Sequence, residues 1–482
     1  MQIGCRESPR ETDDAETSAR SADSGAANVV IFLIDTLRAD RLGAYGYGRP
    51  TSPTIDALAA EGVVFEQAHA PAPWTLPSVA SIMLSRFPCE HGVLIDGDRI
   101  SENAQPLAAR LKKAAYATAS FYANPYAGPM SGLDAGFDVC RSTAMNPATE
   151  VDRWLETLSG APALIYVHTT EPHNPYLAQP RMIRRFGEVS GETIAEVRRL
   201  YGAFRQLTRV NYVRRKPPGT IDNTAEQERV LRSLGRLKPQ IDVLYDAVVR
   251  EADGAVAGVV ETLKRRGLWE DTMFVLISDH GEEMGEHGGW QHDQSVYEEI
   301  VRVPFVIRFP RGQYAGRRIS TPSSLIDLAP TILDYLGQSE LSAGCRGRSL
   351  MPLLTGPGGE GGAEARVTAL RHNKKKYYRP FKEGRGDLNV VVRRGKWKAI
   401  WNDDVQRLEL FDLAGDSAER QDLSARESEL AGALGDFAKS YLEECKVAES
   451  GAGAELPTAE DLERLKSLGY IGDDSEMDDD EE

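Results

Sequence analysis

The sequence predicts an α/β fold built on a large, mostly parallel sheet. Residues 28–35 and 273–280 are continuous apolar runs rich in β-branched side chains, which is typical of strands buried on both faces. Residues 163–170 and 304–308 are two further strands of this kind. Between the strands, apolar residues recur every three or four positions and predict helices at residues 53–61, 77–84, 105–115, 241–266 and 325–336. Alternating strands and helices define the α/β class.

Length and charge narrow the class of protein. A chain of 482 residues is long enough for one large domain and a smaller one. Its 41% hydrophobic and 27% charged residues are ordinary for a globular protein, and the longest apolar run, residues 29–34, is too short to cross a bilayer. The formal net charge of -16 predicts no nucleic-acid partner, because phosphate backbones are bound by clustered Lys and Arg. An anionic substrate would therefore need a local cationic pocket.

Changes in composition divide the chain into four expected parts. The Arg- and Glu-rich stretch 181–238 predicts a helical insertion near the site, for which the role of a lid is open. The Gly- and Pro-rich stretch 352–365 marks a boundary, and strand patterns after it predict a smaller α+β subdomain. The expected parts are a disordered tether (1–27), a catalytic domain (28–365), a C-terminal subdomain (366–472) and an acidic tail (473–482).

The amino terminus carries a hint about the compartment. Ile3-Gly4-Cys5, followed by a polar stretch, resembles the start of a lipoprotein, which would give a membrane tether at Cys5 and a periplasmic or extracellular location. A plain disordered tail is the alternative. The five cysteines are widely spaced, which excludes a zinc ribbon but leaves room for one or two disulfides. We expect a monomer or a homodimer.

Four residues form the candidate site. Asp35 and the pair Asp279-His280 each end a predicted strand, and ligands of open α/β sheets bind beyond the carboxyl ends of strands. Two carboxylates and one imidazole suit a single divalent ion, with Mn, Ca, Mg and Zn as candidates. Thr75 precedes a predicted helix, whose amino terminus would face a phosphate or sulfate group. A metal against the Thr75 hydroxyl would lower its pKa and make it a nucleophile.

Each of these residues also has a structural explanation. An Asp at a strand end is usually a turn residue, and Thr75 by itself is a candidate helix cap. Only the combination favours a catalytic site.

Ordered motifs across the chain resemble those of sulfatases in the alkaline phosphatase superfamily. The opening segments are residues 34–43 (IDTLRADRLG), 45–47 (YGY), 51–59 (TSPTIDALA) and 72–78 (APWTLPS). Further segments follow in the order of the family: residues 91–93, 171–176, 278–282, 285–288, 297–304, 394–398, 409–413 and 465–470. The match runs from about residue 28 to residue 472. The resemblance implies an alkaline-phosphatase-like large mixed sheet sandwiched by helices, with a smaller C-terminal α+β subdomain.

The resemblance also implies roles for single residues. One divalent metal ion would be bound by Asp35, Thr75, Asp279 and His280, with Thr75 as nucleophile. Around the substrate, His173 would contact the transferred group or the leaving oxygen, His91 would lie near the pocket, and His292 or Lys398 would supply positive charge. The remaining histidines are expected to be structural or surface residues: His69, His168, His287 and His372.

Departures from the family pattern decide the chemistry. Thr75 stands where sulfatases carry the Cys or Ser that becomes formylglycine, and a secondary alcohol cannot yield that aldehyde. Val79 and Ala80 occupy the region of an anchoring arginine, and Thr36 replaces a second Asp. Threonine nucleophiles elsewhere in the superfamily act on phosphorus, and a sulfo-threonine would be hard to hydrolyse. The chain is therefore expected to be a metal-dependent hydrolase of sulfate or phosphate/phosphonate esters, with the chemistry favouring phosphorus and the family favouring sulfate.

Two alternatives stay open. The covalent intermediate could be captured by an alcohol of a lipid or glycan, which would make the protein a transferase. The chain could also be a catalytically silent binding protein. In each case the expected partner is a small-molecule, glycan or lipid ester.

Overall fold

The computed structural model describes residues 26–143, 146–208, 224–356, 364–371, 388–445 and 458–468. Cys5, nearly all of the predicted tether and the acidic tail lie outside the described residues. Within the described ranges, no helix is both long enough and apolar enough to cross a membrane.

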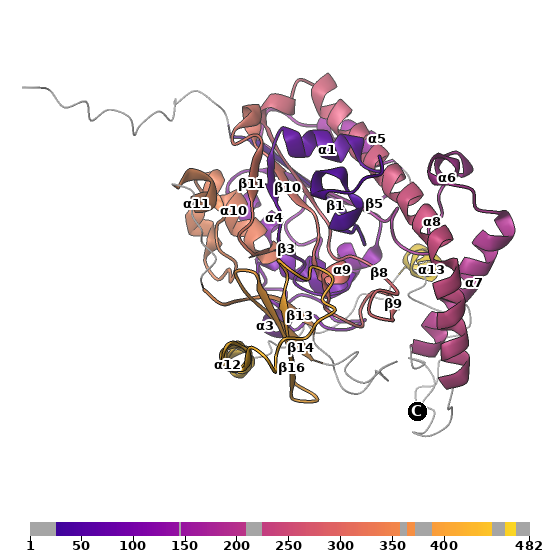
Figure 1. Cartoon of the computed structure of the whole chain (residues 1–482). Coiled ribbons are helices and arrows are strands. Elements are labelled where there is room, and N and C mark those ends of the chain that lie inside the picture. Colours follow the sequence, from indigo (N-terminus) through magenta and orange to yellow (C-terminus); the bar gives the residue numbers. More distant parts are fainter. Residues whose placement is uncertain are drawn as a thin grey trace, which may run out of the picture.

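An eight-stranded mixed sheet forms the centre of the molecule (Figure 1). β1 lies between β6 and β7 and runs parallel to both, whereas β10 is antiparallel to its neighbours β7 and β2. Across the sheet the order is β11 (Arg317–Ile319), β2 (Val63–Phe65), β10 (Phe305–Arg308), β7 (Thr272–Ile277), β1 (Asn28–Ile34), β6 (Ala163–Thr169), β4 (Ala117–Tyr122) and β5 (Val139–Ser142). The predicted mixed sheet is confirmed.

Helices cover both faces of this sheet. Val29, Ile31 and Leu33 of β1 pack on one face, and the intervening residues pack on the other, so the strand is apolar throughout. The first face carries α2 (Thr75–Leu84), α4 (Leu107–Lys113), α10 (Leu328–Tyr335) and α11 (Met351–Thr355). The second face carries α1 (Pro53–Ala60), α5 (Pro147–Leu155) and α8 (Thr224–Arg265).

Within residues 181–238, the described residues are mainly helical and extend to one side of the body (Figure 1). α6 (Pro180–Phe186) and α7 (Gly191–Thr208) both pack against α8. The sequence predicted a helical insertion at residues 181–238 and a separate helix at 241–266, whereas α8 joins the two and continues through Pro239. Arg205 of α7 donates to Asn174 Oδ1 at 2.6 Å, which ties the insertion to the loop after β6. The role of a lid stays a prediction.

The C-terminal subdomain is an antiparallel sheet covered by a helix, as predicted. Its strands, in order, are β13 (Arg366–Arg371), β14 (Asn389–Arg394), β15 (Trp397–Asn402) and β16 (Arg407–Asp412), and α12 (Ser428–Glu444) packs on them. A disulfide between Cys89 and Cys445 joins α3 (Pro88–His91) to the end of α12. The smaller elements are β3 (Ala68–His69), β12 (Ser323–Ser324), β8 (Glu283–Met284), β9 (Trp290–Gln291), α9 (Glu298–Val301) and α13 (Ala459–Ser467).

Candidate functional site

The candidate residues gather where the central strands end. Asp35 follows β1, and Asp279 follows β7 after one intervening residue. Because side chains alternate along a strand, Asp35 and Asp279 continue the rows of Leu33 and Ile277, which face α2. β1 and β7 are parallel, with Leu33 paired to Ile277, so both carboxylates reach the same edge and the same face of the sheet. The predicted convergence of the two carboxylates is therefore confirmed.

The turn after β1 fixes Asp35 against Asp279. Thr36 has φ 57°, in the left-handed region that β-branched residues rarely adopt. Its backbone N–H donates to Asp279 Oδ1 at 3.3 Å, and the Tyr245 hydroxyl of α8 donates to its carbonyl at 2.6 Å. Thr36 thus serves the site through its backbone, in place of the second carboxylate that the family pattern would put there.

Thr75 is the first residue of α2, not its cap. The N-cap is Trp74, which makes no side-chain cap hydrogen bond. Thr75 Oγ1 lies 3.5 Å from Asp35 Oδ2 and 3.3 Å from His280 Nε2. Asn124, which the sequence analysis did not single out, donates its Nδ2 to Asp35 Oδ2 at 3.1 Å and lies 3.4 Å from Thr75 Oγ1. The hydroxyl therefore points into the carboxylate cluster.

The electrostatics of the cluster fit a divalent cation. Asp35 Oδ1 and Asp279 Oδ2 are fully buried and have no hydrogen-bond partner among the described residues. Burial, reinforced for Asp35 by the charge of Asp279, raises the pKa of Asp35 to about 8, and burial raises the pKa of Asp279 to about 7. Two orphaned carboxylate oxygens that repel each other are the environment that a metal ion would relieve.

His280 is oriented as a metal ligand. Its Nδ1 lies 2.9 Å from the Gly281 carbonyl, so the proton sits there and Nε2 keeps its lone pair. Nε2 is 3.5 Å from Asp35 Oδ1 and 3.6 Å from Asp279 Oδ2. Ligands about 2.1 Å from one ion lie roughly 3.0–3.4 Å apart, so these separations suit a shared metal. Burial lowers the pKa of His280, which favours the neutral, ligating form.

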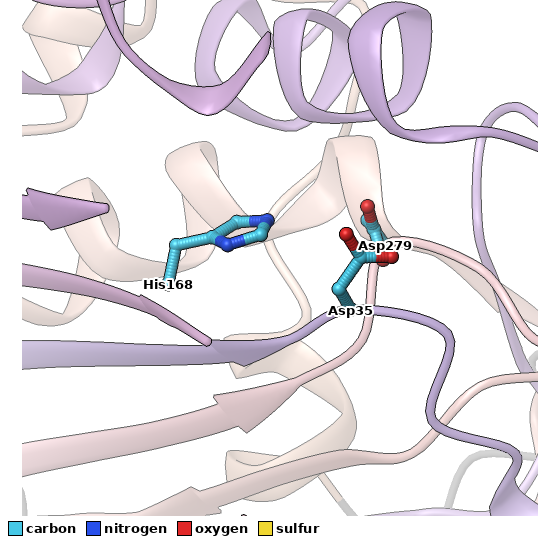
Figure 2. Close-up of side chains that lie close together, drawn as sticks. All are labelled: Asp35, His168 and Asp279. Carbon is cyan, nitrogen blue, oxygen red and sulfur yellow. The ribbon is translucent and has the colours of Figure 1, made fainter. Parts of the chain in front are cut away.

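A further imidazole lies beside the carboxylates. His168, near the end of β6, forms with Asp35 and Asp279 a group whose candidate ligand atoms all lie within 4.8 Å of one another. Figure 2 shows its ring directed toward the two carboxylates. From the sequence, His168 was expected to be a structural or surface residue. Strand alternation could have found it, because His168 continues the row of Leu164 and Tyr166, which faces α2 as Asp35 does.

Two of the predicted substrate residues lie next to this cluster. The ring of His292 is centred 4.5 Å from that of His280 and 5.1 Å from that of His173. His292 Nδ1 is 3.1 Å from Glu282 Oε1, and His173 Nδ1 is 2.7 Å from the Asn174 carbonyl. The contact of Glu282 with His292 was not predicted, although the motif at residues 278–282 was recognised. Burial and the charge of Asp35 raise the pKa of Glu282 to about 8.

His91 and Lys398 have other contacts. His91 Nε2 is 2.9 Å from Ser81 Oγ, and its Nδ1 accepts from the Val93 N–H at 3.1 Å. His91 therefore contacts α2 at Ser81, six residues after Thr75. Lys398 Nζ donates to the Val296 carbonyl and to Glu298 Oε1, and it forms an ion pair with Glu419 at 2.7 Å. The described contacts place neither residue against the carboxylate cluster, and their predicted catalytic roles stay predictions.

Comparison with known proteins gives the family. The Sulfatase profile matches residues 27–338, and the profile of the N-sulphoglucosamine sulphohydrolase C-terminal region matches residues 285–442. N-acetylglucosamine-6-O-sulfatase of Bacteroides thetaiotaomicron is 23% identical over 489 aligned positions, which cover 86% of each chain. The first profile alone covers more than half of the sequence.

Solved structures share the fold at low identity. The phosphonate monoester hydrolase of Agrobacterium radiobacter has a TM-score of 0.62 and 20% identity, covering 86% of this chain and 95% of that one. A structure in complex with its substrate D-glucosamine-2-N,6-O-disulfate has a TM-score of 0.65 and 20% identity, covering 87% of this chain and 99% of that one. The chain belongs to the sulfatase family and is a sulfatase-like ester hydrolase, which confirms the predicted family, fold and enzyme class.

Proposed function

We propose that this protein is a metal-dependent hydrolase of phosphate or phosphonate esters whose nucleophile is the unmodified hydroxyl of Thr75. One observation carries the proposal: Thr75 Oγ1 lies 3.3 Å from His280 Nε2 and 3.5 Å from Asp35 Oδ2, at the position of the family's modified residue. A divalent ion held by Asp35, Asp279 and His280 would lower the pKa of this hydroxyl and polarise the ester.

The first step forms a covalent intermediate. Thr75 Oγ1 attacks phosphorus in line with the leaving oxygen, the bond from phosphorus to that oxygen breaks, and the hydroxyl proton passes to Asp35 Oδ2. The N–H groups of the first turn of α2 and the Asn124 amide lie around the phosphoryl oxygens and offset their charge. The protein thereby uses groups already fixed by the fold.

Two histidines handle the remaining protons. His292, whose Nδ1 is held by Glu282, directs its Nε2 away from that carboxylate and donates a proton to the leaving oxygen. In the second step a water molecule loses its proton to the same imidazole and attacks the phospho-threonine. Phosphate or phosphonate leaves, and Thr75 regains its proton from Asp35. His173, 5.1 Å from His292 between ring centres, contacts the transferred group.

The choice of phosphorus rests on the second step. A sulfo-threonine is an alkyl sulfate, whose attack by water at sulfur is slow, and the aldehyde route is closed to a secondary alcohol. A phospho-threonine can be hydrolysed at phosphorus with metal and acid–base assistance. The structural similarity to a phosphonate monoester hydrolase supports this choice, whereas the glucosamine sulfatase relative supports sulfate and suggests a glycan ester as substrate.

A parallel assay tests the proposal. Metal-reconstituted protein is given an aryl sulfate, a phosphate monoester, a phosphate diester and a phosphonate ester at equal concentrations. We expect the highest kcat/KM for a phosphorus ester, a loss of at least about 1000-fold in kcat for Thr75→Ala, and partial activity for Thr75→Ser, which keeps a hydroxyl. A quenched reaction should show the phosphoryl group on the peptide that contains Thr75. Preference for aryl sulfate, or full activity of Thr75→Ala, would overturn the proposal.

We also propose an extracytoplasmic location. The Cys89–Cys445 disulfide supports it, because disulfides persist mainly in oxidising compartments, and so does the lipoprotein-like Ile3-Gly4-Cys5 start. Alkylation of the native protein in intact cells by a membrane-impermeant thiol reagent, before and after reduction, tests this location. Blocking of Cys89 and Cys445 only after reduction is expected, and a fully reduced pair shielded inside the cell would exclude it.

A further inference from the structure

His168 is a buried histidine that none of the described hydrogen bonds holds in place. Its side chain is fully buried, and neither ring nitrogen has a hydrogen-bond partner among the described residues. Buried polar groups are almost always paired, so such a histidine requires an explanation. Two other buried histidines show the usual arrangement. His69 contacts Thr368 and Glu298, and His91 contacts Ser81 and the Val93 N–H, so each uses both nitrogens.

The position of His168 directs it to the carboxylate cluster. β6 is the parallel neighbour of β1, and His168 pairs in register with Leu33, two residues before Asp35. One ring nitrogen lies within 4.8 Å of an oxygen of both Asp35 and Asp279. Figure 2 shows the imidazole ring directed toward the two carboxylates. The oxygens Asp35 Oδ1 and Asp279 Oδ2 have no hydrogen-bond partner in the described part of the chain either.

We propose that His168 is a second imidazole ligand of the ion bound by Asp35 and Asp279, in addition to His280. This inference rests on the metal site of the proposed function. It explains why unsatisfied nitrogens and unsatisfied oxygens share one buried space, since a cation accepts lone pairs from both. Two imidazoles beside two carboxylates select Mn²⁺ or Zn²⁺ over Ca²⁺, because Ca²⁺ prefers a shell of oxygens.

Counting coordinated imidazoles tests the proposal directly. Full-length protein labelled with ¹⁵N-histidine is stripped of metal, loaded with Mn²⁺ alone and examined by electron–nuclear double resonance. The wild type should show two histidine nitrogens coupled to Mn²⁺, and His168→Gln and His280→Gln should each show one. A wild-type spectrum with a single coupled nitrogen that survives in His168→Gln overturns the proposal.

Binding affinities give a second, independent measurement. By calorimetric titration of the metal-free protein, His168→Gln should weaken Mn²⁺ and Zn²⁺ at least about tenfold and change Ca²⁺ less than about threefold. Tyr166→Phe is the matched control, because Tyr166 lies on the same face of β6 and the ring is kept. Equal losses for all three ions, or no loss, would sink the assignment. None of these readouts needs turnover, so failure of the Thr75 mechanism would leave them unchanged.

Discussion

Two clusters of largely buried polar side chains differ in how their charges are paired. The strand-end cluster consists of Asp35, Thr75, Asp279 and His280. The interdomain network consists of Lys398, Arg393 and Glu419 of the C-terminal subdomain with Glu298 and His69 of the catalytic domain. Both are largely buried, but in the interdomain network Lys398 forms ion pairs with Glu298 and Glu419, whereas the ion pairs of Asp35 and Asp279 among the described residues are with His280.

The difference appears in the preferred protonation states. In the interdomain network, Lys398 and His69 overcome burial and hold the pKa of Glu298 well below its usual value, while Glu298 and Glu419 raise the pKa of Lys398 despite burial. In the strand-end cluster, burial raises the pKa of both carboxylates, Asp35 and Asp279. Burial also raises the pKa of Glu419 to about 7, so the contrast lies in Lys398, which pairs with Glu298 and Glu419. The four residues of the strand-end cluster include no lysine or arginine, so this cluster suits a bound cation.

The largest expected effect comes from removing a carboxylate of the strand-end cluster. Asp279→Asn should release the ion and lower kcat by at least about 1000-fold, since the metal contributes several kcal/mol to the transition state. Metal content by mass spectrometry and turnover of the best ester measure both effects. Asp242→Asn is the control, because Asp242 pairs with Arg41 and Lys238 outside the site. An Asp279→Asn protein that keeps its ion and its rate would contradict the assignment of this cluster.

Removing the lysine of the interdomain network should lower the stability of the protein and leave its metal content unchanged. Lys398→Met leaves the carboxylates of Glu298 and Glu419 buried without their cation, which costs about 3–5 kcal/mol of folding free energy. The metal content should stay at the wild-type level. Denaturant unfolding measures the loss, and Lys398→Met with Glu419→Gln should recover part of it. If Lys398→Met loses turnover at unchanged stability, Lys398 acts in catalysis as the resemblance implied.

The stabilisation of the folded protein by a bound metal ion should depend on pH through the carboxylates of the strand-end cluster. The pKa of Asp35 rises from 3.8 to about 8 on folding without metal, so its stabilising contribution is present below pH 4 and lost as pH rises toward 8. The stabilising contribution of Asp279 is likewise present below pH 4 and is lost as the pH rises toward 7. At low pH the carboxyl groups of Asp35 and Asp279 are protonated, and the metal must displace these protons in order to bind. At pH 8 an ion at about 100 times its dissociation constant should stabilise the protein by about 2.7 kcal/mol, and the gain should shrink at pH 5.5.

Thermal unfolding with and without Mn²⁺ at both pH values measures this gain. Asp279→Asn, which should release the ion, should show almost no Mn²⁺-dependent shift in melting temperature at either pH. An equal shift in melting temperature at pH 5.5 and pH 8 in the wild type would show that the ion binds elsewhere.

The sequence predicted the features that depend on local pattern. The apolar runs ending at Asp35 and Asp279 specified buried strands, and family motifs supplied the ligand set. Short or less apolar strands, such as β4 and β5 at one edge of the sheet, were missed because their sequences do not form a continuous apolar run. Residues 181–238 were predicted to be helical, but their continuity with the helix at residues 241–266 was not predicted, because α8 runs through Pro239, a residue that usually breaks a helix.

The rest of the site depends on which strands become neighbours. His168 becomes a candidate ligand only because β6 pairs with β1, and the pairing of Lys398 with Glu298 depends on how the two domains meet. A sequence pattern does not contain this information. The same holds for Glu282, whose motif was recognised but whose partner His292 comes from the loop around β9.

Glu282 gives the smallest and most selective test of the comparison. Like Asp35 and Asp279 it is a fully buried carboxylate, and its Oε2 has no hydrogen-bond partner among the described residues, but its Oε1 contacts His292. If the charge of Glu282 stabilises the protonated imidazole of His292, Glu282→Gln should lower kcat by about tenfold and leave KM nearly unchanged, because the effect arises in the transition state. Its metal content should equal that of the wild type.

Glu283→Gln, a buried neighbour whose carboxylate accepts from the Gly289 N–H, is the matched control. Loss of the ion in Glu282→Gln would instead assign Glu282 to the strand-end cluster. That cluster would then contain three carboxylates whose charge a bound cation offsets.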